Sequence, residues 1–494
     1  MCDPNTPEQI EGIYFSSMKI SIINPPIRLS DKPRHIPHGL AILANIIRKK
    51  LDIKPVFIDM NAFRYSKEQL RTILTETEFD VVLIGGLIPV YKQIILYAQM
   101  IKEINPKSVI ITGGSAAMSV PELLLSNSKV DVVCAGEGEK ALIDLLNGLK
   151  EEKLENLTHI AGFYFKINGQ IVYSGSSDLL KDIDSESDIP AYDLIPMETY
   201  LSNPIVGFGR DIDFISSRGC PFECTFCYQP WGKSFRGHSI DFVLSALSYL
   251  RKKYHIDFVS FQDDEFMAKP KRVYEFCEKV QRRIPGLLWS CTGRVNFIND
   301  DIVKAMRSSG CVSISYGLES GSARMLESMN KRVSIEQMEK AIRTNRKFGM
   351  MLPVSFIIGM PGEDEDSCRE TVEFCVKNEI PLKSMMFATP YPGTKLFEYA
   401  LNTGRIIDTK VHEFVLKLED ARDFTINLTD CFTDDQLILK RQEMIDEVCS
   451  RVNPLPLQAS TKKLKNLFGA LFEDYLKDKV LAKHRATHGG IDVF

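Results

Sequence analysis

The sequence lacks the compositional features of disulfide-rich, nucleic-acid-binding and disordered proteins. Its 494 residues include only 12 cysteines and two tryptophans, and Lys plus Arg (61) nearly balances Asp plus Glu (65), which leaves a formal net charge of −4. That cysteine density is too low for a disulfide scaffold, and the charge argues against bulk nucleic acid as a partner. With 44% hydrophobic and 26% charged residues, the chain can form large buried cores, which excludes general disorder.

Long apolar runs are also scarce. Residues 1–23 lack the basic segment and apolar core of a signal peptide. The most apolar stretch, 81–100, contains Gly85, Gly86 and Pro89, so it predicts a strand, a turn and a helix and not a membrane span. The sequence therefore predicts a cytoplasmic protein with no transmembrane segment, in which clustered cysteines are more often metal-binding or catalytic than disulfide-bonded.

Residues 1–150 alternate between short apolar runs and amphipathic stretches. The predicted strands lie at 19–23, 56–59, 81–84, 108–112 and 130–134. Buried strands with helices between them predict a doubly wound, Rossmann-like α/β sheet. Glycines close the last two strands, at Gly113-Gly114 and at Gly136 and Gly138. Ligands of such sheets lie at these carboxyl ends, where glycine allows the backbone to approach closely.

Three further regions follow the first. Residues 151–212 read as a linker with a hairpin, because Asn168-Gly169 is a strong hairpin signal. Residues 213–400 again alternate strand and helix, which predicts an open (β/α)6 partial TIM barrel with its site at the strand carboxyl ends. Its predicted strands lie at 213–217, 258–262, 288–292, 313–317, 353–358 and 384–388. Residues 401–494 form a charged region with a helical pattern.

One group of cysteines carries chemical information. Cys220, Cys224 and Cys227 form a C-x3-C-x2-C run directly after a predicted strand. Structural zinc usually takes four ligands, whereas iron–sulfur clusters are held by cysteine thiolates. Three thiolates would leave one iron of a [4Fe–4S] cluster open to a substrate or cofactor. The alternative is a zinc site completed by His238 or a remote cysteine.

With the aromatic Phe226 before its last cysteine, this run resembles the signature of the radical SAM (S-adenosyl-L-methionine, AdoMet) superfamily. The resemblance implies that Cys220, Cys224 and Cys227 ligate a [4Fe–4S] cluster whose open iron binds SAM. It implies reductive cleavage of SAM to a 5′-deoxyadenosyl radical, with electrons from a reductant such as flavodoxin or ferredoxin.

The resemblance extends along the barrel and implies further SAM contacts at the ends of successive predicted strands. Carboxylates would bind the SAM ammonium group or a ribose hydroxyl, an arginine would pair with the SAM carboxylate, and a glycine backbone would contact adenine. These residues are Asp263, Asp264, Glu265, Arg294, Glu319 and Gly359. Solvated loop acids and a structural ion pair are the alternatives for the charged members of this set.

The first region resembles the cobalamin-binding domain that is fused to many radical SAM enzymes. The resemblance rests on Asn24-Pro25-Pro26, residues 37–40, Gly113-Gly114 and residues 136–139. It implies that Gly113, Gly114, Gly136 and Gly138 contact the corrin ring. The sequence has no Asp-x-His-x-x-Gly run, so a lower axial histidine of the methionine-synthase type is not expected on cobalt.

Residues 19–400 are thus similar to the cobalamin-binding-domain radical SAM enzymes, a class B methyltransferase-like family. This implies a methyltransferase with cobalamin, SAM and a [4Fe–4S] cluster as cofactors, which moves a methyl group from methylcobalamin to an unactivated carbon through the 5′-deoxyadenosyl radical. The substrate would be a small molecule or a peptide.

Several other functions stay open. The same cofactors could serve a rearrangement, cyclisation or oxidation without methyl transfer. A tRNA methylthiotransferase is disfavoured, because the first region has only Cys2 and Cys134 and the last region reads as helical. A cobalamin carrier or sensor is disfavoured by the intact cysteine run.

Overall fold

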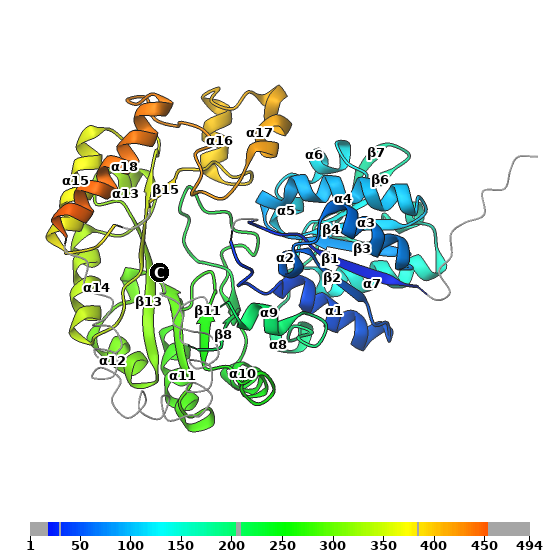
Figure 1. Ribbon diagram of the computed structural model, residues 1–494, viewed down its shortest axis with the longest axis horizontal. Coiled ribbons are helices and arrows are strands. Elements are labelled where there is room, and N and C mark those ends of the chain that lie inside the picture. Colours follow the sequence, from blue (N-terminus) through cyan, green and yellow to red (C-terminus); the bar gives the residue numbers. More distant parts are fainter. Residues whose placement is uncertain (1–17, 29–30, 204–208, 383–384, 453–494) are drawn as a thin grey trace, which may run out of the picture. The chain divides into compact units, whose positions relative to one another are not determined.

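The structure is a computed structural model that describes residues 18–28, 31–203, 209–382 and 385–452. Contacts between residues divide the chain into two compact units, which are described separately (Figure 1). The first unit consists of residues 1–29, 39–181 and 185–195, and the second of residues 30–38, 182–184 and 196–494. Cys2, Ser384 and the tail from residue 453 lie outside the described residues. Over the described ranges, no helix is long and apolar enough to cross a membrane.

The first unit is built on a seven-stranded sheet with the order β2-β1-β3-β4-β5-β6-β7. The first five strands in this order are parallel, and the last two pair antiparallel. The strands are β1 (Ile20–Asn24), β2 (Val56–Asp59), β3 (Val81–Gly85), β4 (Val109–Gly113), β5 (Val132–Cys134), β6 (Phe163–Ile167) and β7 (Gln170–Tyr173). The helices between them include α1 (His38–Leu51), α3 (Lys67–Glu76), α4 (Tyr91–Ile104) and α7 (Gly138–Glu151).

The predicted doubly wound sheet is confirmed. Every residue of β1 and β3 is buried, as expected for strands covered on both faces. The strand order reverses between β1 and β3, so the crevice at their carboxyl ends is the expected ligand position. The hairpin that the sequence analysis assigned to a linker extends this sheet as β6 and β7. Asn168 and Gly169 have φ values of 51° and 81°, as its two-residue turn requires.

The second unit is built on an open six-stranded sheet with the order β15-β14-β13-β12-β11-β8, in which all pairs are parallel. Its strands are β8 (Asp211–Phe214), β11 (Phe258–Phe261), β12 (Leu288–Gly293), β13 (Cys311–Glu319), β14 (Val354–Ile358) and β15 (Met386–Phe387). Helices α10 (Ile240–Tyr254), α11 (Pro270–Arg283), α12 (Asp300–Ser308), α14 (Ile335–Lys347) and α15 (Glu365–Lys377) connect successive strands. The predicted (β/α)6 partial barrel is confirmed (Figure 1).

An aromatic cluster packs the barrel beneath the second strand. The rings of Phe261, Phe276 and Trp289 meet edge to face, with centroids 5.2–5.9 Å apart. Phe266 packs into the same group, and all four side chains are almost completely buried. Each of these rings buries a large apolar area, so the cluster stabilises β11 and β12 and thereby positions the loops that follow them.

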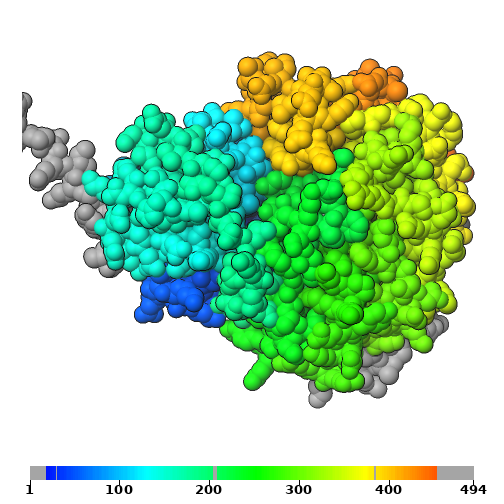
Figure 2. Space-filling model, turned by 180° about the vertical axis from the view of Figure 1, so that it is seen from behind, coloured from blue at the N-terminus to red at the C-terminus, as the bar shows by residue number. Residues whose placement is uncertain are grey.

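The described part of the last region is helical and includes α16 (Lys395–Asn402), α17 (Val411–Lys417) and α18 (Asp434–Arg451). Its apolar side chains share one core with the loops at the strand carboxyl ends. That core contains Met325, Met329, Met360, Leu396, Phe397, Ala400, Ile406 and Leu428. Figure 2 shows the residues near 400–430, in orange, packed against the green and yellow barrel residues.

Candidate cofactor site

The three cysteines lie in one loop that is closed at its base. Strand β9 (Ser217–Arg218) pairs antiparallel with β10 (Arg236–Gly237), and the cysteine loop runs between them. Cys224 is buried, Cys220 is half-buried and Cys227 is exposed. Inside the loop, the Cys227 backbone N–H donates to the Cys224 carbonyl oxygen at 3.2 Å. The sequence thus folds into a preformed turn that presents three thiols.

The donor set fits an iron–sulfur cluster. All three cysteines are free thiols, and over the described residues no three His, Cys, Asp or Glu side chains are grouped to hold a single metal ion. His238, the candidate fourth zinc ligand, stacks on Phe242 and bonds through Nδ1 to Asp184 at 2.7 Å. These contacts orient the ring at the start of α10, and over the described residues no fourth ligand is grouped with the three cysteines to complete a zinc site.

Cys224 lies in a cationic environment. The thiol of Cys227, hydrogen-bonded to Cys224, lowers the pKa of Cys224 to about 6, with Lys331 and Arg294 acting in the same direction. Conversely, this bond raises the pKa of Cys227. Because thiolates are the metal-binding form of cysteine, this environment favours ligation at Cys224.

Asp263 holds the entry to the cysteine loop. Its Oδ1 accepts the Ser216 backbone N–H at 2.6 Å, and its Oδ2 accepts the hydroxyl groups of Ser216 and Ser217, also at 2.6 Å. The carboxylate is 3% exposed. The strand predicted at 213–217 ends at Phe214, because the next residues turn to make these bonds.

The next two acids differ from each other. Asp264 is exposed, and its Oδ2 accepts the backbone N–H of Gly219, the residue before the first cysteine, at 2.8 Å. Glu265 is 2% exposed and accepts the Met267 backbone N–H at 3.0 Å. Burial raises the pKa of Glu265 to about 7, although backbone N–H groups and the charges of Arg294 and Lys331 favour its ionised form. Of the three acids, Glu265 faces the charged residues around Cys224.

Arg294 contacts the cysteine loop directly. Its Nη1 donates to Cys224 Sγ at 3.2 Å, its Nη2 donates to the Lys331 carbonyl oxygen, and its Nε donates to Asn296 Oδ1 at 3.3 Å. Its guanidinium lies 3.6 Å from the ring centroid of Phe222. The side chain that the sequence analysis offered to the SAM carboxylate thus supports a cysteine ligand.

Lys331 is the residue of this site that the sequence analysis missed. It is 7% exposed, and its Nζ bonds to Glu319 Oε1 at 2.8 Å. Its Nζ also lies 5.8 Å from the ring centroid of Phe226. Glu319 ends β13 with a φ of 65°, in the left-handed region. Lys331 lies between Asn330 and Arg332 in an ordinary polar stretch, which carries no signal of burial.

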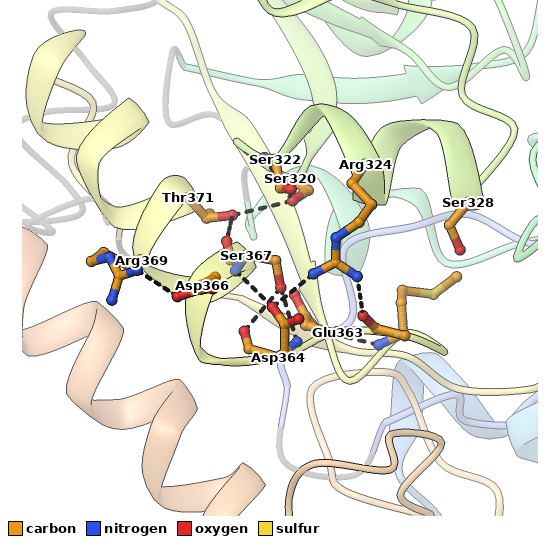
Figure 3. Close-up of polar contacts among 12 residues, drawn as sticks. Ser320, Ser322, Arg324, Ser328, Glu363, Asp364, Asp366, Ser367, Arg369 and Thr371 are labelled. Carbon is orange, nitrogen blue, oxygen red and sulfur yellow. Dashed lines mark hydrogen bonds and ion pairs between the residues drawn. The ribbon is translucent and has the colours of Figure 1, made fainter.

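The turn after β14 is held by a buried carboxylate. Gly359 has a φ of 93°, and its N–H and that of Met360 donate to Glu363 Oε2 at 2.5 and 3.2 Å. Figure 3 shows Arg324, from α13 (Ala323–Ser328), reaching toward this turn, where it bonds to Asp364 at 2.7 Å. Burial raises the pKa of Glu363 to about 7.

The predicted glycines of the first unit lie at the carboxyl ends of β4 and β5. Gly114 has a φ of 76°, and a Cβ there would come within 2.7 Å of the Gly86 carbonyl oxygen. Gly113 precedes it at the end of β4, and Gly136 and Gly138 follow β5. Only glycine fits at Gly114, so the main chain at the end of β4 is left uncovered by a side chain at this position.

Comparison with protein-family models finds two domains in the chain. Residues 214–375 match the radical SAM superfamily model, and residues 26–146 match the B12 binding domain model. The two matches cover the barrel and the doubly wound sheet, respectively.

Curated relatives and solved structures agree with this division. The chain is 34% identical over 391 residues to an uncharacterized methyltransferase of Pyrococcus horikoshii, which covers 78% of this chain and 83% of the relative. It is 25% identical over 395 residues to an anaerobic magnesium-protoporphyrin IX monomethyl ester cyclase of Rubrivivax gelatinosus, covering 78% and 70%. The fold is that of the radical SAM methyltransferase TsrM of Kitasatospora setae, solved with cobalamin and a [4Fe–4S] cluster (TM-score 0.68, 15% identity, 95% and 99% of the two chains).

Proposed function

The chain belongs to the radical SAM superfamily, among members with an N-terminal B12-binding domain, and from this membership we propose that it is a cobalamin-dependent methyltransferase acting on an unactivated carbon. The family resemblance predicted from the sequence is confirmed. The single observation that carries the proposal is the loop of three free thiols beside buried cations, on a chain that also has the B12-binding sheet.

The cofactors are cobalamin, SAM and a [4Fe–4S] cluster, and they supply the methyl transfer and the radical chemistry when bound. We assign the cluster to Cys220, Cys224 and Cys227. The protein's own contribution is to hold these ligands: Asp263 fixes the loop entry, and Arg294 contacts Cys224. Two backbone hydrogen bonds of Thr225 also hold the cysteine loop. Its carbonyl oxygen accepts the Leu396 N–H at 2.9 Å, and its N–H donates to the Met329 carbonyl oxygen at 3.0 Å.

We divide the predicted SAM-binding residues into two groups. On the family resemblance, Glu265, Glu319 and the Gly359 backbone are assigned to SAM. Glu265 and Glu319 are buried, and Lys331, which bonds to Glu319, also lies over the ring of Phe226. Asp263 and Asp264 are assigned to the cysteine loop, because Ser216, Ser217 and Gly219 already occupy their carboxylates. In the first unit, Gly113, Gly114, Gly136 and Gly138 are assigned to the corrin.

A second candidate function is favoured by one comparison. The cyclase relative matches the same share of this chain as the methyltransferase relative, 78%, at lower identity. A cyclisation or oxidation would use the same cofactors without consuming a methyl group. The substrate in either case is a small molecule or a peptide. The reaction would take place in the reducing cytoplasm, with flavodoxin or ferredoxin as the electron source. Because β6 and β7 join the first sheet, we retain from the sequence-based division only the boundaries at residues 212 and 400 as part of this proposal.

The test is anaerobic reconstitution of the full chain with iron, sulfide and cobalamin contents measured together. We expect about four iron and four sulfide per chain, plus bound cobalamin. A chain that binds the cluster and no corrin would overturn both candidate functions. With substrate, a methyltransferase yields both S-adenosylhomocysteine and 5′-deoxyadenosine, whereas turnover with 5′-deoxyadenosine and no S-adenosylhomocysteine favours the second candidate.

A further inference from the structure

A buried ion pair lies beside the cysteine loop. Lys331 and Glu319 are joined by a bond of 2.8 Å, and each side chain is 8% exposed. Removing two charges from water carries a large desolvation cost, and replacement of such a pair by apolar residues is often neutral or stabilising. Apolar residues could stabilise the barrel equally well at this position. We therefore look for a function of the two charges in the neighbouring site.

Lys331 and the cysteine loop are connected through both backbone and side chains. The Met329 carbonyl oxygen accepts the Thr225 N–H at 3.0 Å, and Asn330 Nδ2 donates to the Glu223 carbonyl oxygen at 2.8 Å. Arg294 completes the connection, since it donates to Lys331 O and to Cys224 Sγ. A change in the position of Lys331 would therefore be transmitted to Cys224 through the two hydrogen bonds of Arg294.

Charged groups of both signs surround this connection. The buried cations are Arg294 and Lys331, and the buried carboxyl groups are Glu319 and Glu265. In a low-dielectric interior a charge acts strongly on its neighbours. Both cations favour the thiolate of Cys224, so removing one of them, or the carboxylate that opposes it, alters the field at this sulfur.

We propose that Lys331, held by Glu319 and linked to Cys224 through Arg294, is a positioning residue that sets the reduction potential of the cluster bound by the three cysteines. The inference rests on the proposed function, since it presupposes that cluster. Hydrogen bonds to sulfur and the net charge nearby are both known determinants of cluster potentials. Arg294 supplies the first and Lys331 the second.

The proposal fixes the direction of two opposite effects. Reduction adds one negative charge, which a nearby cation stabilises and a nearby anion destabilises. Lys331→Gln should therefore make reduction less favourable, and Glu319→Gln should make it more favourable. We expect each to change the equilibrium constant for one-electron reduction at least about tenfold, which corresponds to about 59 mV.

The experiment is a redox titration of the reconstituted full-length chain, followed by electron paramagnetic resonance and carried out without SAM. Lys331→Arg keeps the charge and should stay within about twofold of the unsubstituted chain. The matched control is Arg251→Gln, which breaks a partly buried pair with Asp257 (2.7 Å) at the amino end of β11 and should leave the potential unchanged. The double variant of Lys331 and Glu319 should fall between the two single variants.

Shifts of the reduction potential in the same direction for Lys331→Gln and Glu319→Gln would overturn the proposal. A structural disturbance of the loop does not depend on whether a positive or a negative charge was removed, whereas an electrostatic effect does. Unchanged potentials at full iron and sulfide content would overturn it as well. If Lys331→Gln takes up no cluster, the two other variants test the proposal. A raised reduction potential in Glu319→Gln together with a near-normal one in Lys331→Arg supports it, and any other result rejects it. Failure of the unsubstituted chain to bind a cluster would instead reject the proposed function.

Discussion

The two units present their strand carboxyl ends in different ways. In the first unit, glycines line the ends of β4 and β5: Gly113 and Gly114 close β4, and Gly136 and Gly138 follow β5. The buried acids between and after the last two, Glu137 and Glu139, accept hydrogen bonds from residues of the same unit. In the second unit, the same edge carries buried charged side chains of both signs, among them Glu265, Arg294, Glu319 and Lys331. Glycine backbone thus marks the first edge, and paired cations and carboxyl groups mark the second.

This difference matches two kinds of ligand. A glycine edge at the strand-order reversal of a parallel sheet suits a broad group that lies flat against main chain. An edge of buried charges suits small ionic groups, because charges held in a low-dielectric site act strongly over short distances. The first edge should therefore be sensitive to added volume, and the second to altered charge or lost ligands.

The largest expected effect is loss of a cluster ligand. Cys224→Ala should abolish cluster binding and reductive SAM cleavage while cobalamin binding persists, because the two edges belong to different units. Iron, sulfide and corrin contents of the purified variant measure this. Cys431→Ala, at an exposed cysteine, serves as the control and should retain all three. A Cys224→Ala chain with full iron content would contradict the ligand assignment.

The next effect tests volume at the glycine edge. Gly114→Ala combines a left-handed backbone with a Cβ 2.7 Å from the Gly86 carbonyl oxygen, so it should cost about 3 kcal/mol and weaken cobalamin binding. Gly169→Ala is the matched control, since its φ is 81° and nothing lies within 4 Å of an added Cβ, so only about 1 kcal/mol is expected. Hydrogen exchange of β4 reports the first unit, which lacks tryptophan. Equal protection in both variants would show that the contact with Gly86 has no role.

A smaller effect is expected at the loop entry of the second unit. Asp263→Asn keeps the shape of the side chain but replaces one acceptor oxygen by a donor that faces the Ser216 and Ser217 groups. Loss of bonds to a buried carboxylate should cost about 2 kcal/mol and lower cluster occupancy. Unfolding followed by tryptophan fluorescence reports this unit, because Trp231 and Trp289 both belong to it. Asp264→Asn, at the exposed neighbour, should change stability by less than half as much.

Much of this architecture could be predicted from the sequence, for local reasons. Apolar runs closed by glycine identified both sheets, and β2 was predicted at its observed bounds, 56–59. The cysteine run is equally local, since three ligands within eight residues need no long-range information. The turn at Asn168-Gly169 was predicted for the same reason, although its attachment to the first sheet was not.

The roles of individual charged residues could not be predicted, because their partners are distant in the chain. Asp263 bonds to serines 46 and 47 residues earlier. Arg294 meets Cys224 across 70 residues, and Asn330 meets Glu223 across 107. Nothing in a local pattern distinguishes a lysine buried against Glu319 from a solvated one, so Lys331 was found only in the structure.

The smallest effect sharpens the comparison at a glycine turn of the charged edge, where Glu363 holds the Gly359 backbone. Burial raises the pKa of Glu363 from 4.5 to about 7, so the folded chain binds this proton more tightly than the unfolded chain. Stability must then fall as pH rises from about 4.5 through 7, and this residue should account for about 1 kcal/mol between pH 6 and 7.5. Glu363→Gln should remove that share, measured by tryptophan-detected unfolding across this pH range. Glu265, whose pKa burial also raises to about 7, should keep its own share of the slope, and the exposed Glu365→Gln serves as the control. A slope unchanged in Glu363→Gln would mean that the turn is held without a buried charge on Glu363.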